Sequence, residues 1–90
     1  MTIHEFQEHI RLKYGTRDHE RGTPATFMWL IEEIGELASA LGGKTGHDNK
    51  EEEFADVFAW LCTLANINGV DLEKALHAKY FKDGGPKGYK

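Results

Sequence analysis

The chain has 90 residues, of which 29% are charged, and its formal net charge is −4. This length accommodates one small domain with a single hydrophobic core. The acidic balance argues against a dedicated DNA- or RNA-binding protein, because such proteins carry a basic face. No apolar run approaches the ~20 residues of a transmembrane helix, and Glu5 and Glu8 do not fit an export signal. Because the single cysteine, Cys62, cannot form an intrachain disulfide, we expect a cytoplasmic protein.

Apolar residues recur at three- and four-residue steps, which predicts an all-α domain of four helices within residues 1–82. The first helix should cover residues 2–14, with Thr2 and Glu5 forming a capping box and Gly15 ending it. A polar loop is expected from Gly15 to Pro24. Such a charged loop is usually solvated surface, but Arg21 within it could also close over an anionic ligand.

The two central helices are expected to form an antiparallel hairpin. Thr23 and Pro24 indicate the N-cap and first residue of one helix, which should end at Gly42. Asp48 or Asn49 would cap the next helix, and the short turn at 44–47 makes the two helices antiparallel neighbours. Asp71 would cap a last helix that reaches Tyr80. Residues 83–90, rich in glycine and lysine, are expected to form a flexible tail.

Two acidic steps stand in matching places on the central helices. Glu33 and Glu36 lie three residues apart in one helix, and Glu53 and Asp56 lie three apart in the other. This spacing puts both carboxylates of a pair on the same side of a helix, so the hairpin should gather all four near one edge of the core. Like charges beside apolar surface are costly to ionise without a counter-ion, and Mg²⁺ prefers carboxylate oxygens. The competing interpretation is an ordinary solvated acidic face.

A tryptophan lies one helical turn from each acidic step: Trp29 precedes Glu33 by four residues, and Trp60 follows Asp56 by four. Each could stack against a nucleobase. Packing in the core or in a subunit interface fits each of them equally well.

The segments Trp29–Leu37 and Glu52–Val57 resemble the E-x-x-E … E-x-x-D signature of MazG-type nucleotide pyrophosphohydrolases. The resemblance extends to Asn66 and the turn Gly69–Glu73, and so covers most of the chain. It implies a MazG-like helical bundle, a homodimer or homotetramer, that clears unwanted nucleotides from the pool. Such enzymes use Mg²⁺, for which Mn²⁺ could substitute, to cleave a nucleoside triphosphate into monophosphate and pyrophosphate. Carried over residue by residue, the metal ligands would be Glu33, Glu36, Glu53 and Asp56.

The residues themselves, beside this resemblance, indicate roles in catalysis and substrate binding. A carboxylate not fully engaged by metal, Glu33 or Glu36, would take the proton of the attacking water. The family pattern has a phosphate-binding lysine further along the chain, followed by an asparagine. Lys79 matches this lysine only loosely, because Asp83 stands where the asparagine is expected. Asn66 could form a structural hydrogen bond as readily as it could contact phosphate or ribose. The residues expected to contact substrate are Arg21, Trp29, Trp60, Asn66 and Lys79.

Two other functions fit the same residues. A non-catalytic module could bind nucleotide or Mg²⁺, or act as an oligomeric adaptor, since the C-terminal segment departs from the family pattern. A purely structural helical bundle is the third interpretation. In that case, neutralising the four acids should raise stability and have no other effect.

Overall fold

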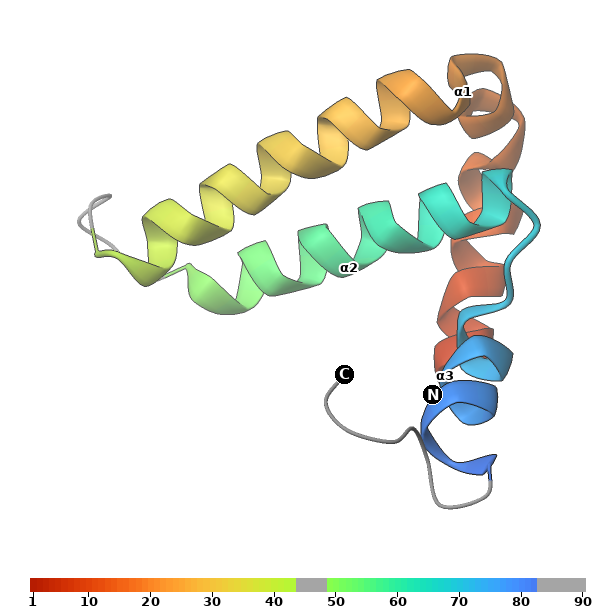
Figure 1. Cartoon of the computed structure of the whole chain (residues 1–90). Helices are drawn as coiled ribbons and strands as arrows, with labels where there is room; N and C mark the ends of the chain where they lie inside the picture. The colour runs from red at the N-terminus through yellow and green to blue at the C-terminus, as the bar shows by residue number, and fades with distance from the viewer. Residues whose placement is uncertain (44–48, 83–90) are drawn as a thin grey trace.

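A computed structural model describes residues 1–43 and 49–82. In these two ranges the chain forms three α-helices and no β-strand, namely α1 (Ile3–Leu41), α2 (Lys50–Ile67) and α3 (Leu72–Tyr80) (Figure 1). The predicted all-α class is confirmed. The predicted count of four helices is not confirmed, because the first two predicted helices are joined in one element, α1, which is interrupted by a bend at Gly22. The predicted turn at 44–47, the candidate cap Asp48 and the tail 83–90 lie outside the described residues.

The start of α1 follows the prediction. Thr2 and Glu5 form the capping box: the Glu5 backbone N–H donates to Thr2 Oγ1 at 3.0 Å, and the Thr2 N–H donates to Glu5 Oε1 at 2.8 Å. The predicted stop at Gly15 and the polar loop from 15 to 24 are wrong. The helix continues through Gly15 to Arg21. One glycine inside a helix costs only about 1 kcal/mol, which contacts of the following turns can offset.

A bend at Gly22 divides α1 into an N-terminal arm (residues 3–21) and a C-terminal arm (residues 23–41). Gly22 has φ 80° and ψ 173°, a backbone conformation that is essentially restricted to glycine. Pro24 follows in the first turn of the C-terminal arm, where its missing N–H is not needed. Because of this bend, the N-terminal arm crosses α2 near the C-terminal end of that helix (Figure 1).

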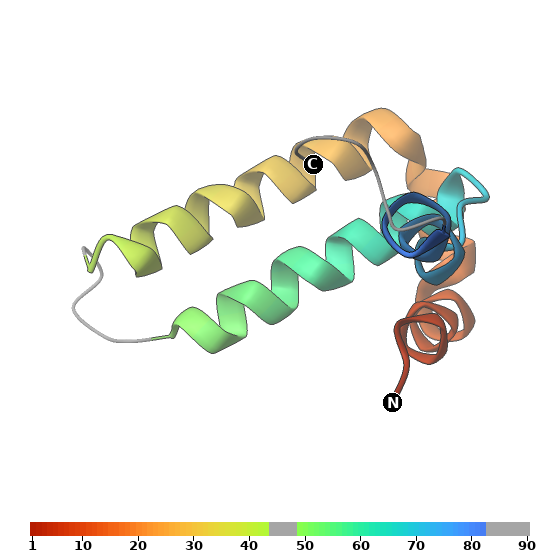
Figure 2. The ribbon, with the colours of Figure 1, turned by 60° about the horizontal axis from the view of Figure 1, so that its bottom comes forward.

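The C-terminal arm of α1 and helix α2 lie side by side and antiparallel, as predicted for the central hairpin (Figures 1 and 2). The arm ends at the predicted Gly42. Helix α3 also starts as predicted, because the Lys74 N–H donates to the Asp71 carboxylate at 3.0 Å. This short helix contacts the beginning of α1, where the His4 N–H donates to Glu73 Oε1 at 2.9 Å.

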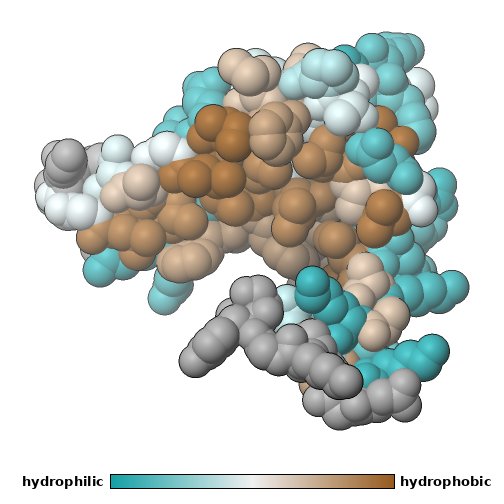
Figure 3. Space-filling view, in the orientation of Figure 1, coloured by the Kyte–Doolittle hydropathy of each residue, from teal (hydrophilic) through white to brown (hydrophobic). Residues whose placement is uncertain are grey.

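The hydrophobic core of a single chain is small. Among the described residues, the buried hydrophobic side chains are Ile10, Leu30, Ala40, Cys62 and Ala65. Many positions with core-like periodicity are instead exposed, and Figure 3 shows a broad hydrophobic surface over the hairpin. We call this surface the apolar face and define it by exposed side chains that recur at helical spacing on the two hairpin helices, namely Phe27, Ile31, Ile34 and Leu41 on α1 and Phe54 and Leu61 on α2.

The extended shape agrees with this small core. The Cα radius of gyration is 14.9 Å, against ~12 Å for a compact domain of this length. Among the described residues, no helix combines the length and the hydrophobicity needed to cross a lipid bilayer.

The bend at Gly22 is testable by substitution. We expect Gly22→Ala to lower the free energy of unfolding by about 1–3 kcal/mol, because a β-carbon strains this backbone conformation. Gly15→Ala should instead raise it by about 0.5–1 kcal/mol, since Gly15 is helical and its β-carbon would meet Arg11 at an ordinary 3.7 Å. Urea unfolding followed by circular dichroism measures both changes. A destabilised Gly15→Ala variant would contradict the continuous helix.

Candidate metal centre

Three carboxylates converge where the two antiparallel helices meet. Glu33 comes from the C-terminal arm of α1, and Glu53 and Asp56 come from α2; one oxygen of each lies within 4.8 Å of the other two. A divalent cation coordinated at about 2.0–2.6 Å separates opposite oxygen ligands by about 4.0–5.2 Å. The acidic cluster therefore has the dimensions of a cation site.

Glu36 lies beside this cluster. Its carboxylate is within hydrogen-bonding reach of both Glu33 and Glu53. Burial and the neighbouring charges of Glu36 and Asp56 raise the pKa of Glu33 to about 7. Burial, followed by the same two charges, also raises the pKa of Glu53. The charges of Glu36 and Asp56 thus act on both Glu33 and Glu53.

Two oxygens of the cluster are buried and lack a hydrogen-bond donor in the described part of the chain. These are Glu33 Oε2 and Glu53 Oε2. The other oxygen of Glu53 accepts a hydrogen bond from Asn49 Nδ2 at 3.1 Å, so Asn49 orients this carboxylate from the start of α2. A buried carboxylate oxygen without a donor is unfavourable. The donor set and its unpaired oxygens fit a hard divalent cation.

The two tryptophans pack against each other next to the cluster. The rings of Trp29 and Trp60 are nearly parallel, with centroids 5.9 Å apart. The Arg21 guanidinium lies 4.9 Å from the Trp60 ring centroid, and its Nε donates to Thr26 Oγ1 at 3.0 Å. Its Nη2 pairs with Asp18. Arg21 is therefore held at the end of a helical arm, not in the loop that the sequence predicted.

Asn66 and Lys79 do not join the acidic cluster. Asn66 exchanges hydrogen bonds with Gln7: its Oδ1 accepts from Gln7 Nε2 at 2.9 Å, and its Nδ2 donates to the Gln7 carbonyl at 3.2 Å. It also lies ten residues after Asp56, or about 15 Å along α2. Lys79 is exposed on α3, which follows the far end of α2 (Figure 1).

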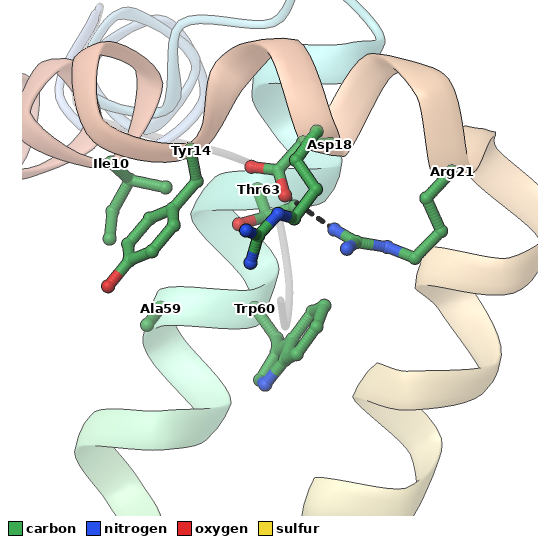
Figure 4. A pocket seen from close by; sticks show the side chains of 8 residues that line it. Ile10, Tyr14, Asp18, Arg21, Ala59, Trp60 and Thr63 are labelled. Atoms are coloured by element: carbon green, nitrogen blue, oxygen red, sulfur yellow. Dashed lines mark hydrogen bonds and ion pairs between the residues drawn. The ribbon is translucent and has the colours of Figure 1, made fainter.

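A pocket of about 320 Å³ lies between the N-terminal arm of α1 and the second half of α2 (Figure 4). Its residues Arg17 and Asp18 are not among those predicted from the sequence, because the loop expected at 15–24 gives them no defined side of a helix. Continuing the helical period past Gly15 would have placed Ile10, Tyr14 and Asp18 on one side of a helix. The pocket is lined by Ile10, Tyr14, Arg17, Asp18, Arg21, Ala59, Trp60 and Thr63.

A comparison with known families finds a match over most of the chain. The profile of the MazG nucleotide pyrophosphohydrolase domain matches residues 21–82, which include all four carboxylates and both tryptophans. No curated protein matches the chain.

The raised pKa of Glu33 gives stability a specific pH dependence. The folded protein binds this proton more tightly than the unfolded chain, so stability falls as pH rises from the ordinary value of 4.5 to about 7. Glu53 acts in the same direction. The pKa values of Glu5, Glu8 and Asp71 are lowered, so these groups change stability in the opposite direction and at lower pH. We expect the metal-free protein to lose stability across this window.

Urea unfolding at a series of pH values, with chelator present, measures this loss. Glu33→Gln should reduce the slope because it removes the titrating group. The adjacent and exposed Glu32 provides a matched control, and Glu32→Gln should keep the slope. An equal slope in the protein and in Glu33→Gln would contradict the assigned titration.

Proposed function

The chain belongs to the MazG nucleotide pyrophosphohydrolase family, and on this premise we propose that it hydrolyses a nucleoside triphosphate to the monophosphate and pyrophosphate. The substrate is an NTP or dNTP, and the role is removal of unwanted nucleotides from the pool. The observation that carries the proposal is the acidic cluster, in which two buried carboxylate oxygens lack a donor within the described residues. A purely structural helical hairpin gives no reason to bury like charges in this way.

We propose Mg²⁺ as the cofactor, with Mn²⁺ as a substitute, held by Glu33, Glu53 and Asp56 and by Glu36 at the margin. The oxygen-only donor set favours these hard cations over zinc. When bound, Mg²⁺ neutralises the charge of the triphosphate and lowers the pKa of a coordinated water. Glu36 lies outside the closest group of three and still reaches Glu33 and Glu53. We therefore favour Glu36 over Glu33 as the group that accepts the proton of the attacking water.

The substrate contacts proposed from the sequence divide into two groups. Trp29 and Trp60 stack on each other one helical turn from the cluster and Arg21 lies over the Trp60 ring, and we keep these three residues as substrate contacts. Asn66 is engaged by Gln7, and Lys79 is carried by α3 beyond the far end of α2. We therefore propose no contact within the same chain for Asn66 or Lys79.

We also propose that the protein is a homo-oligomer, a dimer or a tetramer, assembled through the apolar face. Phe54 on this face is 56% exposed although it stands in the central hairpin. A contiguous apolar surface of several large side chains is unfavourable in water and is typical of an interface. The small core of one chain also needs additional burial for stability. A second copy supplies a matching surface under twofold symmetry.

The activity prediction concerns the ligands of the cluster. With Mg²⁺, we expect pyrophosphate release from at least one member of a complete NTP and dNTP panel. Asp56→Asn should lower kcat/KM by more than ~100-fold. Mutation of a residue that only supports a metal ligand already lowers activity by about 10- to 100-fold, and loss of the ligand itself should cost more. Glu36→Gln should abolish turnover but retain metal binding, which calorimetry can measure.

Glu32→Gln is the control, because Glu32 lies on the adjacent helical position and points away from the cluster by about 100°. This variant should keep its activity. Nucleotide binding without product across the panel would contradict the proposed reaction and favour a non-catalytic binding module. Full activity in Asp56→Asn would show that the ligands are assigned wrongly.

The oligomer prediction concerns the apolar face. Size-exclusion chromatography with light scattering should give a mass of two or four chains of 10.2 kDa each. Phe54→Glu should shift the protein to the monomer, because a buried charge in an apolar interface is costly. Leu12→Glu changes an exposed leucine outside the apolar face and should leave the mass unchanged. A monomeric wild-type protein at micromolar concentration would contradict self-association.

A further inference from the structure

The pocket between the N-terminal arm and α2 combines aromatic walls with one unusual polar group. Trp60 and Tyr14 contribute aromatic surface, and Ile10 and Ala59 contribute aliphatic surface. In Figure 4, Asp18 and Trp60 lie on opposite sides of the pocket, with Tyr14 and Arg21 at its flanks. A volume of about 320 Å³ suits a small planar ring, and concave sites of this composition are typical of small-molecule binding.

On α2, the residues that line the pocket begin one helical turn beyond Asp56 of the acidic cluster. Asp56, Trp60 and Thr63 follow one another at steps of four and three residues, so they lie on one stripe of the helix. The rise from Asp56 is about 6 Å to Trp60 and about 10 Å to Thr63. A nucleotide whose phosphates lie at the cluster would therefore carry its base toward the pocket.

The carboxylate of Asp18 is the polar group that distinguishes this pocket. Asp18 is only 4% exposed, and its Oδ1 accepts a hydrogen bond from Arg21 Nη2 at 2.5 Å. Its Oδ2 is buried and finds no donor among residues 1–43 and 49–82. The hydrogen bond from Arg21 therefore occupies Asp18 Oδ1, whereas Asp18 Oδ2 stays available as an acceptor. A buried acceptor of this kind favours a ligand that brings a donor.

Arg21 fixes the direction of this acceptor. Its guanidinium bonds to Asp18 on one side and to the fully buried Thr26 hydroxyl on the other, and it stacks on Trp60. The Asp18 carboxylate is therefore presented by a rigid arrangement at the bend of α1. Preorganised polar groups discriminate more strongly between ligands than mobile ones do.

We propose that this pocket holds the nucleobase and that Asp18 Oδ2 accepts a hydrogen bond from its exocyclic amino group. Asp18 is then a specificity-determining residue that selects amino-bearing bases (cytosine, adenine or guanine) over uracil and thymine. A carboxylate pairs with the amino group of cytosine, whereas uracil presents the O4 acceptor at the same place, where two acceptors repel each other. The inference rests on the proposed function, because the nucleotide must have its phosphates at the acidic cluster.

The test compares kcat/KM for nucleotides with and without an exocyclic amine. The wild-type protein should prefer the best amino-bearing triphosphate over UTP by about tenfold or more. Asp18→Asn replaces the acceptor by an amide of the same shape that can donate to O4, so this ratio should fall about tenfold. Glu20→Gln removes an equal charge from the same arm outside the pocket and should leave the ratio unchanged.

The outcomes separate the two proposals. Turnover with the same base ratio in wild type and Asp18→Asn would overturn the inference and leave the proposed reaction intact. If no nucleotide is turned over, the proposed reaction fails, and binding of CMP and UMP followed by tryptophan fluorescence decides the role of the pocket. If circular dichroism shows that Asp18→Asn does not fold, the same binding measurement on the wild-type protein tests whether the pocket selects amino-bearing bases. Equal affinities for CMP, AMP, GMP and UMP would overturn the inference.

Discussion

The repulsion among carboxylates held at the seam of two packed helices is the constraint on which the rest of the structure depends. Glu33, Glu53 and Asp56 project from two helices that pack side by side, and the packing of these helices keeps the three carboxylates near one another. Asn49 donates a hydrogen bond to one oxygen of Glu53. In the metal-free protein, proton uptake at Glu33 reduces the remaining repulsion among the carboxylates. A bound cation would relieve it at higher pH and stabilise the fold by mass action.

The bend at Gly22 connects this seam to the rest of the molecule. Because the backbone turns there, the N-terminal arm crosses α2 and forms a pocket with it. The stacked pair Trp29 and Trp60 lies next to both the acidic cluster and the pocket. Groups suited to phosphate and metal therefore come from the hairpin, and groups suited to a base come mostly from the N-terminal arm. This division would allow base preference to change without altering the metal ligands.

The sequence was sufficient where periodicity and spacing were strong. Matched acidic steps placed Glu33 next to Asp56 because both helices have a clear apolar stripe and a short connection. The polar run after Gly15 predicts a loop where the structure has a helix, because a helix that is stabilised by the pair Asp18 and Arg21 has no apolar repeat to reveal it. Burial was also overestimated: side chains such as Phe54 share the core period, yet they are exposed in a single chain. Periodicity identifies an apolar stripe and does not tell whether the same chain or a partner covers it.

We propose above all that the acidic cluster binds a divalent cation. Anomalous diffraction from crystals soaked with Mn²⁺ above pH 7 tests it most directly, because it locates the ion without reference to activity. We expect an anomalous peak within coordination distance of Glu33, Glu53 and Asp56, and no peak in Glu53→Gln crystals treated in the same way. A saturating soak that leaves the cluster without a peak, or places Mn²⁺ elsewhere, would contradict it.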